Sequence, residues 1–98
     1  MKYKIEQLLN RGYESVARVG KIGIYTTAVD FLNKIEEELT ETEEEFLDVN
    51  EYIETITDRQ AEEITDIIQT CCNMLIHYKR NPIEEIEKVV IKNEKRAK

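Results

Sequence analysis

Two acidic clusters of the same design stand out in this chain of 98 residues. They are Glu37-Glu38-Leu39-Thr40-Glu41 and Glu62-Glu63-Ile64-Thr65-Asp66. In each cluster, a glutamate pair precedes an apolar residue, and a third carboxylate follows three positions after the second glutamate. On a helix, residues i and i+3 lie on neighbouring turns of one face, roughly 4.5 Å apart along the axis. Each cluster therefore aims two carboxylates in one direction.

Four convergent carboxylates repel one another unless a cation lies between them. Glu38 with Glu41, and Glu63 with Asp66, are thus the two halves of a predicted divalent-metal site. Hard oxygen ligands suit Mg²⁺ or Mn²⁺. These ions in turn suit a substrate that carries a pyrophosphate group.

The frame around the clusters resembles that of the MazG-like all-α nucleoside triphosphate pyrophosphohydrolases. The family pattern is ExxE, a variable gap and then ExxD, and it is carried here by residues 34–41 and 62–68. The ending Lys92-Asn93-Glu94-Lys95-Arg96 also resembles the Lys/Asn/Arg ending of the family's last helix. The likeness covers about two thirds of the chain and leaves residues 1–30 without a place in the family pattern.

The resemblance implies hydrolysis of an NTP or dNTP between the α and β phosphates, which yields a nucleoside monophosphate and pyrophosphate. One or more Mg²⁺ ions, or Mn²⁺, would neutralise the triphosphate and activate a water molecule. The metal ligands would be Glu38, Glu41, Glu63 and Asp66. Glu37 and Glu38 are the catalytic candidates, with Glu37 acting either as a general base or as an outer support of the metal site.

Positively charged side chains are the natural partners of the substrate phosphates. Lys34 lies on the same predicted helix border as Glu38 and Glu41. The tail adds Lys92, Asn93, Lys95 and Arg96, although basic residues at a helix C-terminus would equally complement the helix dipole. The candidates for base recognition are Tyr13, Tyr25, Phe31 and Asn73, and the sequence does not choose among them.

Composition predicts an all-α protein with a single domain spanning residues 1–98. The chain is 41% apolar and 36% charged, with three glycines, one proline and no tryptophan, which suits a small bundle of about four helices. A domain of this size buries only roughly two thirds of its unfolded surface. Oligomerisation would help it, and the resemblance implies completion of the bundle as a homodimer or a homotetramer.

Start and stop signals divide the chain into four predicted helices. Residues 2–19 form the first, with a kink or break at Gly12. Thr27 and Thr57 begin capping boxes for the second and third helices, which reach about Leu47 and Lys79. Asn81 followed by Pro82 begins the last helix, which reaches about Lys95. A short helical turn is expected within residues 48–57.

Apolar periodicity predicts how the second and third helices pack. Each has an apolar stripe with an acidic border on the same rotational side, so packing of the stripes would bring both acidic borders to one seam. The stripes are Ala28, Leu32, Ile35, Leu39 and Phe46 in the second helix, and Ile64, Ile67, Cys71 and Leu75 in the third.

Several classes of function are disfavoured. A formal net charge of −7 with no basic stripe argues against nucleic-acid binding. No apolar run is long enough to span a membrane, and the first residues do not lead into a signal-peptide core, so we expect a cytoplasmic protein. Cys71 and Cys72 lack metal or redox spacing and are interpreted as packing residues. His77 is interpreted as structural, with pocket lining as the alternative.

Two other functions stay open at this point. A non-catalytic acidic helical protein could place its negative face in the basic groove of a regulatory partner. A metal-binding relative could hold nucleotides without hydrolysing them. ExxE alone is weak support because it recurs at Glu41/Glu44, Glu51/Glu54 and Glu84/Glu87. The doubled glutamate in an apolar frame, repeated in two helices, favours the enzyme.

Overall fold

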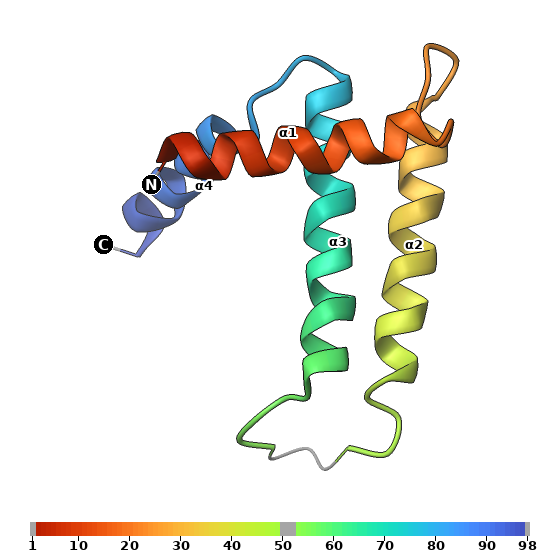
Figure 1. Cartoon of the computed structure of the whole chain (residues 1–98). Coiled ribbons are helices and arrows are strands. Elements are labelled where there is room, and N and C mark those ends of the chain that lie inside the picture. Colours follow the sequence, from red (N-terminus) through yellow and green to blue (C-terminus); the bar gives the residue numbers. More distant parts are fainter. Residues whose placement is uncertain (1, 50–52, 98) are drawn as a thin grey trace.

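The computed structural model describes residues 2–49 and 53–97 and is built of four helices (Figure 1). They are α1 (Lys2–Arg18), α2 (Ala28–Glu44), α3 (Asp58–His77) and α4 (Pro82–Arg96). The described residues contain no strand, so the all-α class with four helices is confirmed. Within the same residues, no helix combines the length and apolar character that a membrane crossing requires.

Side-chain caps fix where α2 and α3 begin, as predicted. The Thr27 hydroxyl accepts the N–H of Asp30 at 3.3 Å, and the Asp30 carboxylate accepts the N–H of Thr27 at 2.8 Å. Thr57 and Gln60 form the same reciprocal pair at 3.1 and 2.9 Å. Each cap satisfies backbone donors that the first turn of a helix leaves without partners.

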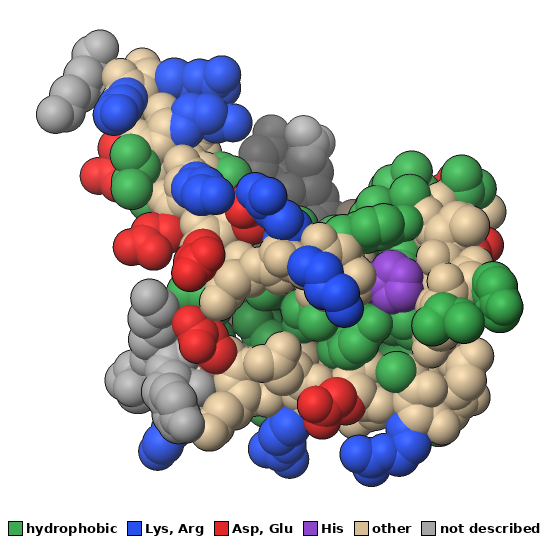
Figure 2. Space-filling model, turned by 90° about the horizontal axis from the view of Figure 1, so that it is seen from above, with side chains coloured by type: hydrophobic (Ala, Val, Ile, Leu, Met, Phe, Trp, Pro, Cys, Tyr) green, Lys and Arg blue, Asp and Glu red, His purple; other side chains and the backbone are tan. Residues whose placement is uncertain are grey.

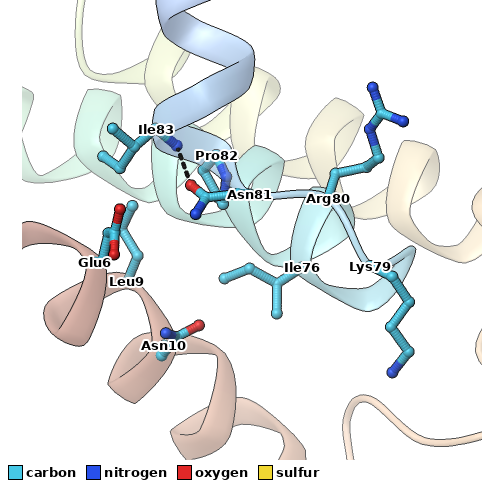
Figure 3. Close-up of a pocket in the computed structure, with 9 residues that line it drawn as sticks. All are labelled: Glu6, Leu9, Asn10, Ile76, Lys79, Arg80, Asn81, Pro82 and Ile83. Atoms are coloured by element: carbon cyan, nitrogen blue, oxygen red, sulfur yellow. Dashed lines mark hydrogen bonds between the residues drawn. The ribbon is translucent and has the colours of Figure 1, made fainter.

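The start of α4 is also as predicted. The Asn81 side chain accepts the N–H of Ile83 at 2.9 Å, and Pro82 occupies the first turn (Figure 3). This corner lies beside α1, where Leu9 and Asn10 face it across a pocket of about 240 Å³. The corner therefore connects α4 to the central part of the molecule.

One prediction about a helix boundary is wrong. The second helix ends at Glu44, and residues 45–48 form turns instead of continuing the helix to Leu47. The predicted helical turn in the connector is absent from residues 53–57, and residues 50–52 of that prediction lie outside the described residues. The chain thus leaves α2 earlier than its apolar pattern suggests.

Gly12 does not break α1, which continues as one helix to Arg18. The helix α1 crosses α3 (Figure 1), and Gly12 lies against Gln69 of α3. A Cβ atom at this position would lie 2.6 Å from the side-chain amide of Gln69. Gly12 is therefore explained by the close approach of two helices and not by a bend in one of them.

The helix α3 is central and contacts α2, α1 and α4. α2 runs antiparallel to it, and α1 crosses the pair at the end where α2 begins and α3 ends (Figure 1). The opposite turns of α2 and α3 have no described helix over them. The radius of gyration is 15.5 Å, compared with about 13 Å for a compact chain of this length. One chain alone is thus an open structure.

The prediction that the two apolar stripes pack on each other is wrong for Leu32, Leu39 and Ile64, which are exposed at 55%, 48% and 36%. Glu38 and Glu63, in contrast, are buried at 7% and 8%. Both helices are rotated so that the acidic border of each stripe, instead of its centre, faces the other helix. Among the described apolar residues the buried ones are Ile22, Phe31, Cys72 and Pro82.

Hydrogen bonds between α2 and α3 hold this rotation. The Thr42 hydroxyl donates to the backbone oxygen of Glu38 on its own helix at 2.8 Å and also lies 3.3 Å from the backbone oxygen of Glu63, across the seam. The buried Gln60 amide donates to the backbone oxygen of Glu45 at 3.0 Å. The seam between the helices is therefore polar, and its specificity comes from directed bonds as well as packing.

Replacing Gly12 by leucine is expected to lower the free energy of unfolding by about 1–3 kcal/mol, because the new side chain must displace Gln69 or separate α1 from α3. Equilibrium unfolding in urea measures the change. Glu14→Leu, at an exposed position of the same helix, is the matched control and should change stability by less than about 0.5 kcal/mol. Equal stability of the two variants would show that the crossing is not closely packed.

Candidate metal centre

Three glutamates from the two motifs meet between α2 and α3. Glu38, Glu41 and Glu63 each place one carboxylate oxygen within 4.8 Å of the other two. Oxygens that share one Mg²⁺ at about 2.1 Å lie at most about 4.2 Å apart. A small closing movement would therefore let all three carboxylates bind one ion.

Two of these carboxylates are deeply buried and incompletely paired. Glu38 and Glu63 are 7% and 8% exposed, and the Oε2 atom of each has no hydrogen-bond partner among the described residues. A buried carboxylate oxygen without a donor is unfavourable and calls for an explanation. A cation between the helices supplies one, since it would bind the oxygens that the protein leaves unpaired.

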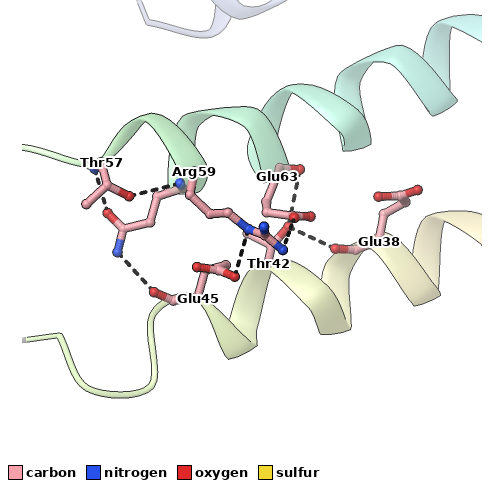
Figure 4. A network of polar contacts seen from close by, with 7 residues as sticks. Glu38, Thr42, Glu45, Thr57, Arg59 and Glu63 are labelled. Carbon is pink, nitrogen blue, oxygen red and sulfur yellow. Dashed lines mark hydrogen bonds and ion pairs between the residues drawn. The ribbon is translucent and has the colours of Figure 1, made fainter.

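The second oxygen of each buried glutamate faces a positive side chain. Lys34 Nζ lies 3.2 Å from Glu38 Oε1. The Arg59 guanidinium lies 3.6 Å from Glu63 Oε1 and 3.2 Å from Glu45 Oε1 (Figure 4). Sequence reasoning missed Arg59, although its spacing four residues before a motif glutamate is the pattern of a helical ion pair.

Burial raises the pKa of Glu63 above its ordinary value. The positive charge of Arg59 opposes this effect, while the negative charges of Glu41, Asp66 and Glu38 add to it. Loss of water favours the neutral acid, and so does each nearby carboxylate. The cluster therefore favours either a proton or a cation at Glu63.

Asp66 is not part of the three-glutamate cluster. It is exposed, and it lines an adjacent pocket together with Glu37 and Glu38. Glu37 is also exposed, and its carboxylate lies 3.4 Å from Lys34 Nζ. The structure thus brings three of the four predicted metal ligands together and places the fourth, with the candidate base, at the edge of the pocket.

The basic tail lies apart from the cluster within one chain. Lys92, Asn93, Lys95 and Arg96 are exposed on α4, which extends away from α2 (Figure 1). Lys and Arg side chains gather toward the far end of this arm (Figure 2). Any contact of these residues with the acidic cluster would have to come from another copy of the chain.

A pocket of about 610 Å³ opens beside the cluster, between α1, α2 and α3. Two of the predicted base-binding candidates, Phe31 and Asn73, line it. Tyr25 is 89% exposed and is not among the lining residues. Tyr13 also lies outside the lining, where its hydroxyl is 3.0 Å from Nδ1 of His77. His77 thus connects α1 with α3, in agreement with a structural role.

Comparisons with protein-family models, with curated proteins and with solved structures give no significant match. The resemblance to the MazG-like family therefore rests on the motif residues themselves. What the structure adds is that two motif glutamates are buried against a third.

Glu63→Gln is expected to raise the Tm of the metal-free protein at neutral pH by a few degrees and to abolish the further rise on adding Mg²⁺ or Mn²⁺. A raised pKa means that the folded protein holds this proton more tightly than the unfolded chain. The resulting stabilisation is present at low pH and is lost as the pH rises from about 4.3, the ordinary glutamate value, through the raised pKa. Glutamine removes this loss because it carries no charge. Thermal unfolding with and without the metal measures both effects.

Glu62→Gln is the matched control, since Glu62 is the exposed neighbour of Glu63. It should leave the metal-free Tm and the metal-induced shift unchanged. A Glu63→Gln protein that still gains stability from Mg²⁺ would remove Glu63 from the metal site.

Proposed function

We propose that this chain is a Mg²⁺-dependent nucleotide pyrophosphohydrolase that cleaves an NTP or dNTP between the α and β phosphates, giving the monophosphate and pyrophosphate. The observation that carries the proposal is the pair of buried glutamates, Glu38 and Glu63, whose unpaired oxygens lie beside Glu41. A merely solvated acidic face would leave its carboxylates in water. The motif frame supplies the reaction class, and the burial supports a cation.

The residues of the cluster have distinct parts in this proposal. Bound Mg²⁺, or Mn²⁺, supplies charge neutralisation and an acidified water molecule. Glu38, Glu41 and Glu63 would hold the ion, and Asp66 would join them from the edge of the pocket. Glu37 is exposed on the pocket side, where it could accept a proton from the attacking water.

Lys34 would change partners when the site is loaded. It now pairs with Glu38 and Glu37 at 3.2 and 3.4 Å. An ion bound to Glu38 would replace Lys34 as the partner of that carboxylate. The ammonium group, half-exposed at the pocket, would then be available to a phosphate oxygen.

The competing functions make different demands on these residues. An acidic module that binds a basic partner needs accessible carboxylates, and burial of Glu38 and Glu63 does not serve it. A protein that binds metal and nucleotide without hydrolysis would use the same residues. Product formation is the property that separates the last case from the enzyme.

We also propose that the chain works as a homodimer or a homotetramer. It exposes 8057 Å², whereas a folded monomer of its mass exposes about 5,800 Å². The excess, about 2,200 Å² per chain, lies within the range of about 1,000–2,500 Å² per subunit that obligate dimers bury. Self-association would bring the surface of each chain close to that of an ordinary globular protein.

The exposed apolar rows identify where the second copy would pack. The rows are formed by Leu32 and Leu39 on α2 and by Ile64 and Ile68 on α3, all of them exposed at 36% or more. By the 100° step of an α-helix, these rows lie on the side of the helix pair away from the pocket. A second copy packed there would enclose the acidic seam among four helices. The predicted apolar stripes would then be buried between chains.

Pyrophosphate release from a panel of NTPs and dNTPs should require Mg²⁺ or Mn²⁺ and stop in EDTA. Glu38→Ala and Asp66→Ala should each lower the rate by about 100-fold or more, since even the residues that support a metal ligand contribute about 10–100-fold. Release of pyrophosphate is followed directly for each nucleotide.

Glu84→Ala and Glu87→Ala are the controls for this assay, because these two residues repeat the ExxE spacing at exposed positions of α4. Both should retain full activity. If no nucleotide releases pyrophosphate, the proposed hydrolase activity is contradicted. That result would favour an acidic interaction protein, whose binding to its partner should not depend on metal.

Sedimentation velocity should show the wild-type chain as a dimer or a larger species at micromolar concentration. The double variant Leu39→Lys/Ile68→Lys should shift it to monomer, because two charges per chain would be buried at the interface. Ile24→Lys is the control, since Ile24 is 89% exposed in the loop before α2, away from the apolar rows. A monomeric wild type would refute the assembly.

A further inference from the structure

The pocket beside the acidic cluster has an apolar wall built by the N-terminal part of the chain. Val16 from α1 and Ile22 from the following loop line it together with Phe31 at the start of α2. Ile22 and Phe31 are 7% and 4% exposed, so this wall is well packed. A flat apolar group such as a nucleobase suits an aromatic and aliphatic surface of this kind.

The lining of the same pocket also offers paired amides. Gln69 Nε2 donates to Asn73 Oδ1 at 2.7 Å, and both residues line the pocket. Because that bond uses the Gln69 nitrogen and the Asn73 oxygen, the Asn73 amide nitrogen is left as a donor and the Gln69 oxygen as an acceptor for a ligand in the pocket. An adjacent donor and acceptor match the edge of a nucleobase.

The pocket opens onto the acidic cluster. Glu38 belongs to both, and Asp66 and Lys34 line the pocket near it. A ligand with its base against the amides would therefore have its first phosphate beside Glu38 and Asp66. Lys34, whose ammonium lies 3.2 Å from Glu38, would be within reach of that phosphate.

Arg59 lies on α3 beyond the acidic cluster, on the side away from Gln69. Successive turns of α3 carry, over about 15 Å along the axis, Gln69, Asp66, Glu63 and Arg59. The Arg59 side chain is 68% exposed and reaches toward Glu63 and Glu45 (Figure 4). A cation bound to Glu63 would take over that carboxylate. The Nη atoms of Arg59 would then be free to bind phosphate oxygens, while its Nε stays 3.2 Å from Glu45 Oε1.

We propose that this pocket binds the nucleoside end of the substrate and that the phosphates run along the α2–α3 seam, with the leaving pyrophosphate directed toward Arg59. The Gln69–Asn73 pair reads the base, and Arg59 is a phosphate-binding residue. This inference rests on the proposed function and gives the substrate a direction. It also gives residues 16–31 a role that the family resemblance does not supply.

Calorimetry with ligands that cannot be hydrolysed tests the direction. The probes are nucleoside monophosphates and α,β-methylene nucleoside triphosphates, titrated in the presence of Mg²⁺. Arg59→Gln should weaken triphosphate-analogue binding about 10-fold and leave monophosphate binding unchanged, because a monophosphate does not reach Arg59. Gln69→Leu should weaken both by a similar factor and reduce the preference among bases.

Arg80→Gln is the control for Arg59, since Arg80 is an exposed arginine that pairs with Glu85 on the α4 side. It should bind every probe as the wild type does. Thermal unfolding establishes that each variant folds. For a readout without substitution, NMR of the wild-type protein should show the side-chain amides of Gln69 and Asn73 shifting when a monophosphate is added.

The outcomes separate this inference from the proposed function. Equal weakening of monophosphate and triphosphate binding in Arg59→Gln would overturn the direction, and so would unshifted Gln69 and Asn73 amides in the saturated wild type. Active wild-type enzyme with either result would leave the proposed function intact. If the probes bind as expected but no pyrophosphate is released from any nucleotide, the assignment of the subsites stands and the proposed hydrolase activity is refuted. Failure of the wild type to bind any probe would overturn both.

Discussion

The burial of two like charges between two helices is the constraint on which this structure depends. Glu38 and Glu63 face one another from α2 and α3 with little access to water, and Glu41 adds a third charge. Lys34 and Arg59 offset part of the repulsion from positions that are themselves exposed. An arrangement of this kind opposes folding in the metal-free protein, because the pKa of Glu63 is raised. The rest of the molecule must therefore hold the helices together against it.

The contacts that do so lie at both ends of the helix pair. At one end, the Gln60 amide bonds the backbone of Glu45, the C-cap of α2, and Thr42 reaches the backbone of α3. At the other end, α1 crosses over Gln69 with a glycine at the point of approach. The Thr42 contact is made to the backbone of Glu63 itself, so it holds the helices together at the place where the glutamates meet. A cation bound there would relieve the repulsion that these contacts oppose.

Capping signals in the sequence predicted where the helices begin, whereas the apolar stripes predicted less well how the helices pack. Thr27, Thr57 and Asn81 act on backbone atoms two or three residues away, so their effect can be seen in a short segment. The rotation of α2 against α3 depends on Thr42 and Gln60 meeting backbone atoms of another helix. The role of Gly12 depends in the same way on Gln69. No local pattern contains these contacts, and the apolar stripes indicate which faces avoid water without showing which neighbour covers them.

The ExxE spacing illustrates the same limit for the site. Glu84 and Glu87 repeat it on α4, but both are exposed, and solvent screens their charges. Glu38 and Glu41 have the same spacing and differ because α3 places Glu63 against them. The clustering of the carboxylates therefore comes from the seam and not from the spacing, and Asp66 shows this within a single motif. It has the predicted position on α3 yet stays at the pocket edge, where it is better placed to meet a ligand in the pocket than to share the buried cluster.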